Sequence, residues 1–110
     1  MNHSIEAERA ALLARVEQLA AHWQPRMGVA ASAWTIRAMR TRWGSCTIRS
    51  RRIRIALAMA RLPEELLEYV VVHELAHLIE PGHGAAFRGV MDRFLPDWRA
   101  RRQLLRGPAV

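Results

Sequence analysis

The sequence carries a group of histidines and one glutamate at a spacing that suits a catalytic metal site. His73, Glu74 and His77 form the pattern H-E-x-x-H, and His83 follows six residues after His77. On an α-helix, residues 73 and 77 lie about 40° apart on one face, so both imidazoles reach one metal ion. Glu74 lies about 100° round from His73, where its carboxylate suits a general base better than a third ligand. The spacing therefore predicts one zinc ion per chain, with Glu74 beside a metal-polarised water.

The same histidines also have a purely structural interpretation. Histidines on an apolar helix are commonly core residues whose rings bond to backbone carbonyls, although the full pattern favours metal binding. Glu80 lies seven residues after His73 on the same face, which makes it a candidate third ligand or a partner of a ligand. A solvated glutamate at a helix end accounts for Glu80 more simply, so we keep His83 as the third ligand.

Two further side chains near the motif are candidates for chemistry. Tyr69 lies one helical turn before His73 on the same face, and its hydroxyl is a candidate donor to a transition-state oxyanion or to a ligand. Simple packing of the ring is the alternative. Cys46 is the only cysteine, which excludes an internal disulfide, and we expect a small buried thiol there rather than a further metal ligand.

Hydrophobic periodicity predicts the elements that must position these residues. Apolar residues at three- and four-residue steps predict an amphipathic helix over about 4–23, which Pro25 and Gly28 should end. Two or three antiparallel strands are expected over about 33–59, where apolar residues alternate with arginine and threonine.

The second half of the chain is expected to be helical. Pro63 followed by two glutamates predicts the start of a helix over about 63–80 that is apolar over most of its circumference and therefore buried. Further helices are expected over about 84–106, with a break at Pro96. The sequence thus predicts an α+β fold, in which residues 1–110 form one domain and a small antiparallel sheet packs on the motif helix.

Composition limits the partners of the protein. The formal charge is +7, and all seventeen basic residues other than histidine are arginine. Eight of them lie in segment 37–61, which makes this segment a candidate to bind a nucleotide or nucleic acid, with a solvated basic surface as the alternative. Because no apolar run is long enough to cross a bilayer and no secretory signal is evident, we expect a cytoplasmic protein without a membrane partner.

Three segments resemble the YgjP-like metallopeptidase domain, and more loosely SprT-like domains and the minigluzincins. They are Arg42-Trp43-Gly44-Ser45-Cys46, residues 69–78 and His83-Gly84-x-x-Phe87, and the resemblance spans roughly residues 33 to 105. It implies a zincin-like fold, with His73, His77 and His83 as zinc ligands and Glu74 as general base. It also marks Arg42 and Trp43, beside Tyr69 and Glu80, as candidates to support the ligands or contact the substrate.

The leading hypothesis for function is zinc-dependent hydrolysis of a peptide or protein substrate. An extended peptide would pair with a sheet edge, offered by the strand near Trp34–Arg40 or the one near Ile53–Leu57. One alternative is a nucleotide pyrophosphatase that uses the same zinc site and the arginines of segment 37–61, an activity attributed within the YgjP-like group. Another is a nucleic-acid-associated module of the SprT-like kind, in which zinc mainly supports the fold.

Overall fold

The computed structural model describes residues 2–107 and residue 110, and the side chains from residue 4 onward. Residues 1, 108 and 109 of the expected domain lie outside the described residues. The elements follow the order α1 (Asn2–Met27), β1 (Ala33–Arg37), β2 (Gly44–Thr47), β3 (Arg52–Ala56), a 3-10 helix η1 (Leu57–Arg61), α2 (Glu64–Ala76), α3 (Ala85–Phe94) and α4 (Trp98–Leu104). The expected α+β class is confirmed.

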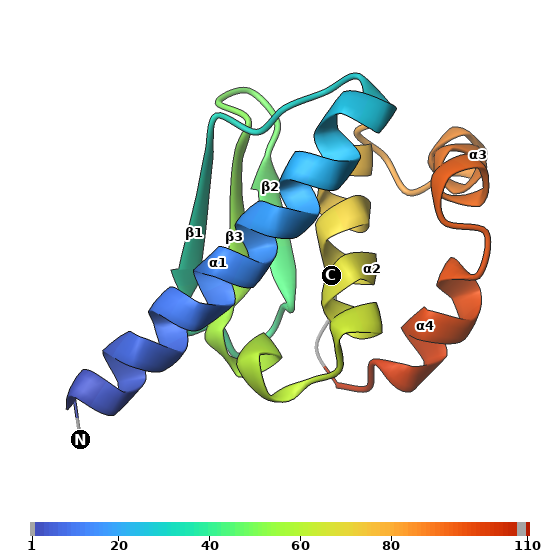
Figure 1. Cartoon of the computed structure of the whole chain (residues 1–110). Helices are drawn as coiled ribbons and strands as arrows, with labels where there is room; N and C mark the ends of the chain where they lie inside the picture. Colours follow the sequence, from blue (N-terminus) through green and yellow to red (C-terminus); the bar gives the residue numbers. More distant parts are fainter. Residues whose placement is uncertain (1, 108–109) are drawn as a thin grey trace.

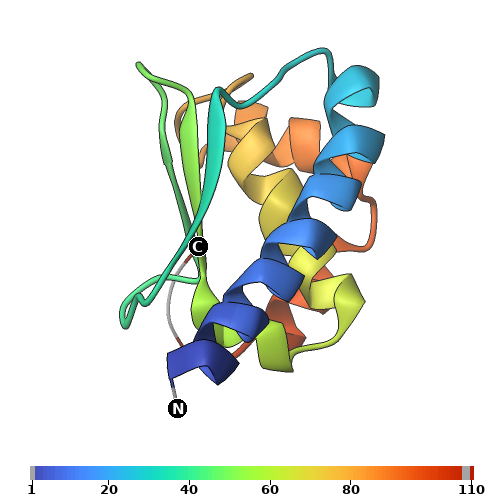
Figure 2. The same cartoon turned by 60° about the vertical axis from the view of Figure 1, so that its left-hand side comes forward.

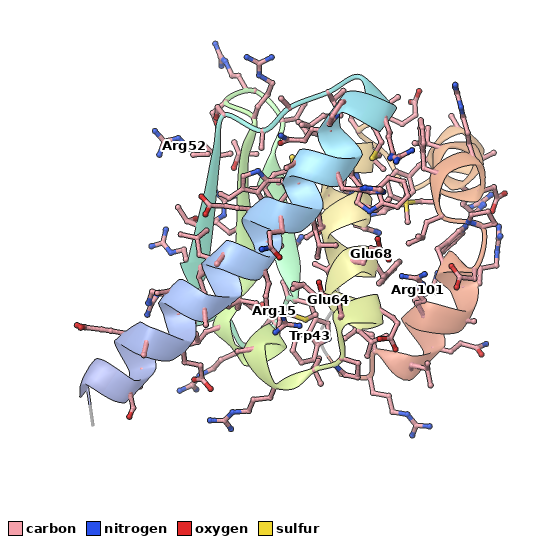
Figure 3. The ribbon with its side chains drawn as sticks, in the orientation of Figure 1. Arg15, Trp43, Arg52, Glu64, Glu68 and Arg101 are labelled. Carbon is pink, nitrogen blue, oxygen red and sulfur yellow. The ribbon has the colours of Figure 1, made fainter. Side chains whose placement is uncertain are left out.

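The helices lie on one face of the sheet, and α2 is the central element (Figure 1). Turned by 60°, the molecule shows the sheet nearly edge-on, with α1 and α2 on the same side of it (Figure 2). The inner face contributes Ile36, Ile53 and Ile55 to the core, because residues two apart in a strand point to the same face. The outer face carries Thr35, Arg37 and Arg52, which are exposed, and Arg52 points away from the sheet (Figure 3).

The sheet is mixed, so the expectation of an antiparallel sheet is wrong for one of its two pairings. The strand order is β1-β3-β2; β1 pairs with β3 in parallel, while β2 pairs with β3 antiparallel. Residues 38–43 carry the chain across the end of β3, which places the last strand between the first two. Alternation in a sequence indicates which face of a strand is buried, but it holds no information on the direction of the partner strand.

Helix α1 continues one turn beyond its expected end, through Pro25 to Met27. Gly28 stops it with a φ of 71°, and the amides of Gly28 and Val29 donate to Gln24 O at 2.9 and 3.3 Å. The Gln24 side chain then accepts hydrogen bonds from Ala31 N at 3.0 Å and from Trp34 Nε1 at 3.3 Å. One glutamine therefore fixes both the end of α1 and the start of the sheet.

Helix α2 is buried along most of its length, as its apolar composition predicts. Every residue from Leu66 to Ala76 except Glu68 is buried, and α2 packs against α1, α3, α4, β2 and β3. The expected helical span of 63–80 is too long at its end: the α-helix closes at Ala76, and residues 77–79 form tighter turns with Leu78 N–H donating to Leu75 O at 3.0 Å. Pro81 then prevents any continuation.

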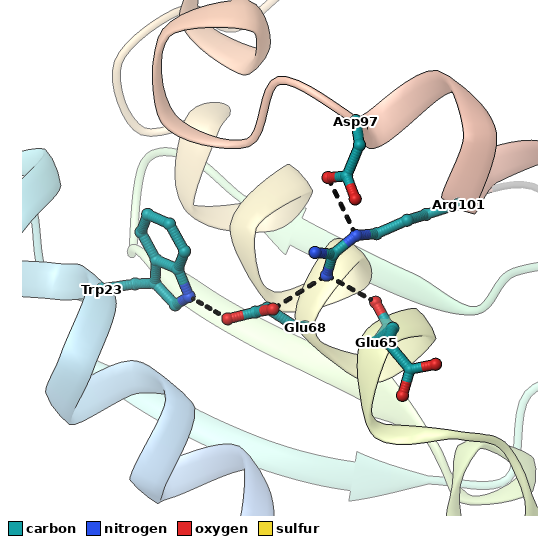
Figure 4. A network of polar contacts seen from close by, with 5 residues as sticks. All are labelled: Trp23, Glu65, Glu68, Asp97 and Arg101. Atoms are coloured by element: carbon teal, nitrogen blue, oxygen red, sulfur yellow. Dashed lines mark hydrogen bonds and ion pairs between the residues drawn. The ribbon is translucent and has the colours of Figure 1, made fainter.

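Glu68, the residue of α2 that is not fully buried in this stretch, joins three helices. Its carboxylate accepts from Trp23 Nε1 of α1 at 2.8 Å and from Arg101 of α4 at 2.8 Å (Figure 4). Arg101 also bonds to Asp97 at 3.1 Å and to Glu65 O at 3.0 Å. Because the Glu68 and Arg101 side chains are only 24% and 17% exposed, this ion pair is better shielded from water than the others at the surface.

Replacing Glu68 by alanine should lower the free energy of unfolding by about 1–3 kcal/mol, because Trp23 Nε1 and the Arg101 guanidinium lose their shared acceptor. Urea unfolding followed by circular dichroism measures the change. The control is Glu64→Ala, which breaks an ion pair to Arg15 whose glutamate side chain is 52% exposed, and should cost less than about 1 kcal/mol. Equal effects of the two substitutions would contradict the role of Glu68.

Candidate metal centre

The histidine pair of the motif lies at the buried end of α2. His73 is 4% exposed, His77 is 7% exposed and Glu74 between them is 1% exposed. The Nε2 atoms of the two histidines are 3.2 Å apart. Ligand nitrogens of a tetrahedral zinc ion are about 3.3 Å apart, since each Zn–N bond is about 2.0–2.1 Å. The two imidazoles are therefore spaced as ligands of one ion would be.

The turn after α2 brings a third imidazole to the pair. Pro81 and Gly82 redirect the chain, and the ring of His83 lies 4.5 Å from that of His77 and 5.4 Å from that of His73, centroid to centroid. One nitrogen from each of the three histidines lies within 4.8 Å of the others. His83 is exposed, unlike the other two, so the group is open to solvent on this side.

The rings are held by their neighbours. Pro81 O accepts a hydrogen bond from His77 Nδ1 at 3.0 Å, so the proton of His77 is on Nδ1 and its Nε2 carries a free lone pair. Phe87 of α3 stacks on His77 with ring centroids 4.6 Å apart and packs edge-on against His73 at 4.9 Å. These contacts fix the ring planes before any ion binds, which favours metal affinity.

The environment keeps these imidazoles neutral, as metal ligands must be. Burial, with added repulsion from His77 and His83, lowers the pKa of His73 to about 3, and burial likewise lowers the pKa of His77. The Nε2 atoms of His73 and His77 are 3.2 Å apart, which suits a shared cation between two neutral rings. His73 Nδ1 has no protein partner among the described residues. The donor set therefore fits a divalent metal ion that prefers imidazole nitrogen.

Glu74 points to the sheet side of α2, towards β2. Burial raises the pKa of its carboxyl to about 8, against the positive charges of Arg42 and Arg54, which lower it. Its Oε2 atom is buried and has no hydrogen-bond partner within the described part of the chain. A Cβ at Gly44 would lie 2.9 Å from this oxygen and 2.8 Å from Val70 Cγ1, so only glycine at this position leaves room for the carboxyl.

A cavity of about 470 Å³ opens beside the histidines. Tyr69 and His73 of α2, His83, and Phe87 and Arg88 of α3 line it. Residues of α4 and of the segment that follows line it as well, namely Trp98, Arg102, Leu105, Gly107 and Val110. The volume is in the range of about 300–1,000 Å³ that is usual for ligand sites.

The remaining candidate residues lie around this centre. Tyr69 is fully buried, and its hydroxyl lacks a partner among the residues described; burial raises its pKa to about 12. Trp43 is half-buried with a similarly unpartnered indole nitrogen, and Arg42 is exposed. Glu80 is half-buried and does not belong to the group of three possible ligands.

Cys46 lies on β2, half-buried, and is outside the histidine group. Burial, with a smaller contribution from the charge of Glu74, raises the pKa of the thiol to about 11, so the thiol stays protonated. It is half-buried, where we expected a buried thiol.

Several residues of the site were not singled out by sequence reasoning. Gly44 and Phe87 entered only through the family resemblance, and Trp98, Arg102 and Leu105 did not enter at all. The helical spacing of His83 and Phe87, four residues apart, could have indicated that Phe87 lies near the motif. Nothing in the sequence indicates that α4 returns to the histidines, because that depends on how α3 and α4 pack.

Comparison with known proteins assigns the chain to a family. The sequence profile of the YgjP-like, metallopeptidase domain family matches residues 2–107. The crystal structure of the metallopeptidase zymogen of Pyrococcus abyssi abylysin is similar with a TM-score of 0.73 and 25% identity, covering 86% of this chain and 99% of that one. The metallopeptidase zymogen of Methanocaldococcus jannaschii jannalysin shares the fold, with a TM-score of 0.67 and 18% identity over 82% of this chain and 97% of that one. No curated protein sequence matches the chain. On this evidence the chain belongs to the YgjP-like metallopeptidase domain family.

Proposed function

We propose that this chain is a zinc-dependent peptidase in which His73, His77 and His83 hold the metal and Glu74 is the general base. The observation that carries the proposal is the convergence of three imidazole nitrogens within 4.8 Å, next to a buried carboxyl whose oxygen has no partner in the described residues. When bound, zinc acts as a Lewis acid that polarises water and the scissile carbonyl.

Glu74 and Tyr69 have separate roles in the proposed reaction. Glu74 takes a proton from the attacking water and returns it to the leaving amine. A carboxyl whose pKa is raised to about 8 by burial can both accept and release a proton near neutral pH. Tyr69 lines the cavity, and burial raises the pKa of its hydroxyl to about 12, so the hydroxyl stays protonated and is proposed as a donor to the oxyanion.

The substrate is proposed to be a peptide or protein, and an extended peptide would pair with β2. Of the two strands that we expected to offer an edge, β3 is central and already pairs on both sides, whereas β1 is an edge strand. The other edge is β2, which packs against α2. A peptide that continues the sheet from β2 would run beside the helix that carries Glu74.

The alternative partners, a nucleotide or nucleic acid, have weaker support. Arg37, Arg52 and Arg49 are exposed on the sheet and its hairpin, and no residue of segment 37–61 lines the cavity among the described residues. No helix in the described part of the chain is long and apolar enough to cross a membrane. Assays with nucleoside triphosphates and salt-dependent DNA binding remain the tests of these alternatives.

Replacing His83 by alanine should weaken zinc binding by at least about 100-fold, because it removes one of three ligands. Elemental analysis and competition with a chromogenic chelator measure the affinity. Zinc should raise the melting temperature of the wild type and fail to do so in the variant, since only a bound ion stabilises the folded state. This readout needs no turnover, which matters because both structural relatives are zymogens.

His22→Ala, which removes an exposed histidine from α1, is the control and should bind zinc as the wild type does. If His83→Ala keeps the wild-type affinity while Glu80→Ala loses it, then Glu80 is the third ligand and our assignment is wrong.

Replacing Glu74 by glutamine should leave zinc bound while lowering kcat by about 100- to 10,000-fold, because the amide has nearly the shape of the carboxyl but cannot accept the proton. A peptide library read by mass spectrometry, together with zinc content, provides the measurement. Glu80→Gln is the matched control, with activity near that of the wild type. Full turnover by Glu74→Gln would refute the proposed base.

Replacing Gly44 by alanine should displace Glu74, because the added Cβ would meet Glu74 Oε2 at 2.9 Å and Val70 Cγ1 at 2.8 Å. The expected cost is about 1–3 kcal/mol of stability, as for other overpacked cores, with a lower kcat and zinc retained. The control is Gly89→Ala on α3, where a Cβ meets nothing within 4 Å; alanine should be tolerated there. Wild-type stability and kcat for Gly44→Ala would show that the carboxyl does not depend on this gap.

A further inference from the structure

Two arginines line the cavity beside the histidines, and no acidic residue lines it among those described. Arg88 is on α3 and Arg102 is on α4. Arg102 lines the cavity together with Tyr69 and His73 of α2. The guanidinium of Arg88 donates to His83 O at 3.3 Å, which holds it beside the third histidine. Positive charge therefore faces the cavity from two helices.

These two arginines differ from Arg99 and Arg101 of α4 in lacking a carboxylate partner. Arg99 is bound to Asp92 at 2.6 Å, and Arg101 is bound to Glu68 and Asp97 at 2.8 and 3.1 Å. Within the described residues, neither Arg88 nor Arg102 forms an ion pair. The charge of Arg88 does act on Asp92, one turn further along α3, but that carboxylate already accepts from Trp98 Nε1 at 2.8 Å and from Arg99.

The remaining walls of the cavity are apolar or aromatic. Phe87, Trp98 and Leu105 line it together with the two arginines. A ligand that fits such a site has a negatively charged group for the guanidinium forks and apolar surface for the aromatic walls. A metal ion held by three neutral imidazoles would add to the positive charge of this region.

We propose that this cavity is a substrate subsite for a peptide carboxylate, which Arg88 and Arg102 bind next to the scissile bond. The inference rests on the proposed peptidase function and adds a substrate class to it, namely peptides with an acidic group beside the cleaved bond. The carboxylate comes from an aspartate or glutamate side chain or from the free end of the peptide. A planar guanidinium suits either source, because it donates two parallel hydrogen bonds to a carboxylate.

Binding to the zinc-loaded Glu74→Gln protein tests the subsite without consuming the ligand. Isothermal titration calorimetry would compare short peptides, blocked at both ends, that carry Glu, Gln or Lys at each position in turn. We expect the best Glu peptide to bind about tenfold more tightly than its Gln isostere. A Gln peptide with a free carboxyl end distinguishes the two sources: tight binding by this peptide would assign the subsite to the chain end.

Arg88→Gln and Arg102→Gln should each reduce the preference for the carboxylate about three- to tenfold, and the double variant should remove it. In the active protein, KM for the acidic peptide should rise by the same factors, while kcat changes little. The matched controls are Arg93→Gln on α3 and Arg99→Gln on α4, which lie outside the cavity lining and should keep the preference. Zinc content and circular dichroism establish that each variant is folded and loaded.

The outcomes separate this inference from the proposed function. Peptide hydrolysis without any preference for an acidic group, or a preference that survives in the double arginine variant, would overturn the subsite and leave the peptidase. Binding that prefers Glu over Gln and depends on Arg88 and Arg102, in a protein that cleaves no peptide, would support the subsite and reject the peptidase. Equal affinity for the Glu, Gln and Lys peptides would overturn the subsite whatever the activity.

Discussion

The burial of three titratable side chains in one apolar helix is the constraint on which the rest of this structure depends. His73, Glu74 and His77 are each less than a tenth exposed, on a helix that the core surrounds. Charged forms of these groups are costly in that environment, so burial depresses the pKa values of the histidines and raises that of the glutamate. Among the described residues, His73 Nδ1 and Glu74 Oε2 are buried without a hydrogen-bond partner, which fits a site that holds a metal ion.

The geometry of a helix then places the proposed metal ligands and the proposed general base on different sides of α2. Residues 73 and 77 share a face, and the turn at Pro81 and Gly82 returns His83 to it, whereas residue 74 points towards β2. Different residues position the side chains on each side of α2. Pro81 O and Phe87 hold the imidazoles, and the missing side chain of Gly44 leaves room for the carboxyl. A change on one side should therefore affect metal binding, and a change on the other should affect proton transfer.

The helices after the motif, α3 and α4, line the cavity beside the histidines and give it two arginines. Glu68 connects α1, α2 and α4 through Trp23 and Arg101, so the position of α4 is tied to the motif helix itself. That position brings Trp98 and Arg102 into the lining of the same cavity as His73. Since Arg99 and Arg101 pair with carboxylates while Arg102 does not, the pairing pattern along one short helix decides which arginine is available to a ligand.

The sequence alone determined the H-E-x-x-H motif, the buried helix that carries it and the α+β class, because these follow from local spacing and periodicity. His73, Glu74 and His77 lie within four residues of one another, so a single helix is enough to bring them together. Because α2 is apolar over most of its circumference, it had to lie at the centre of the fold.

Tertiary structure alone decided the parallel pairing of β1 with β3, the edge position of β2 and the return of α4 to the histidines. It also decided that Gly44 lies against Glu74 and that Arg88 and Arg102 share a cavity. These contacts join residues far apart in the chain, and their identity depends on which elements pack together. Local residue patterns indicate which face of a helix or strand is buried, but they do not indicate which other element packs against that face.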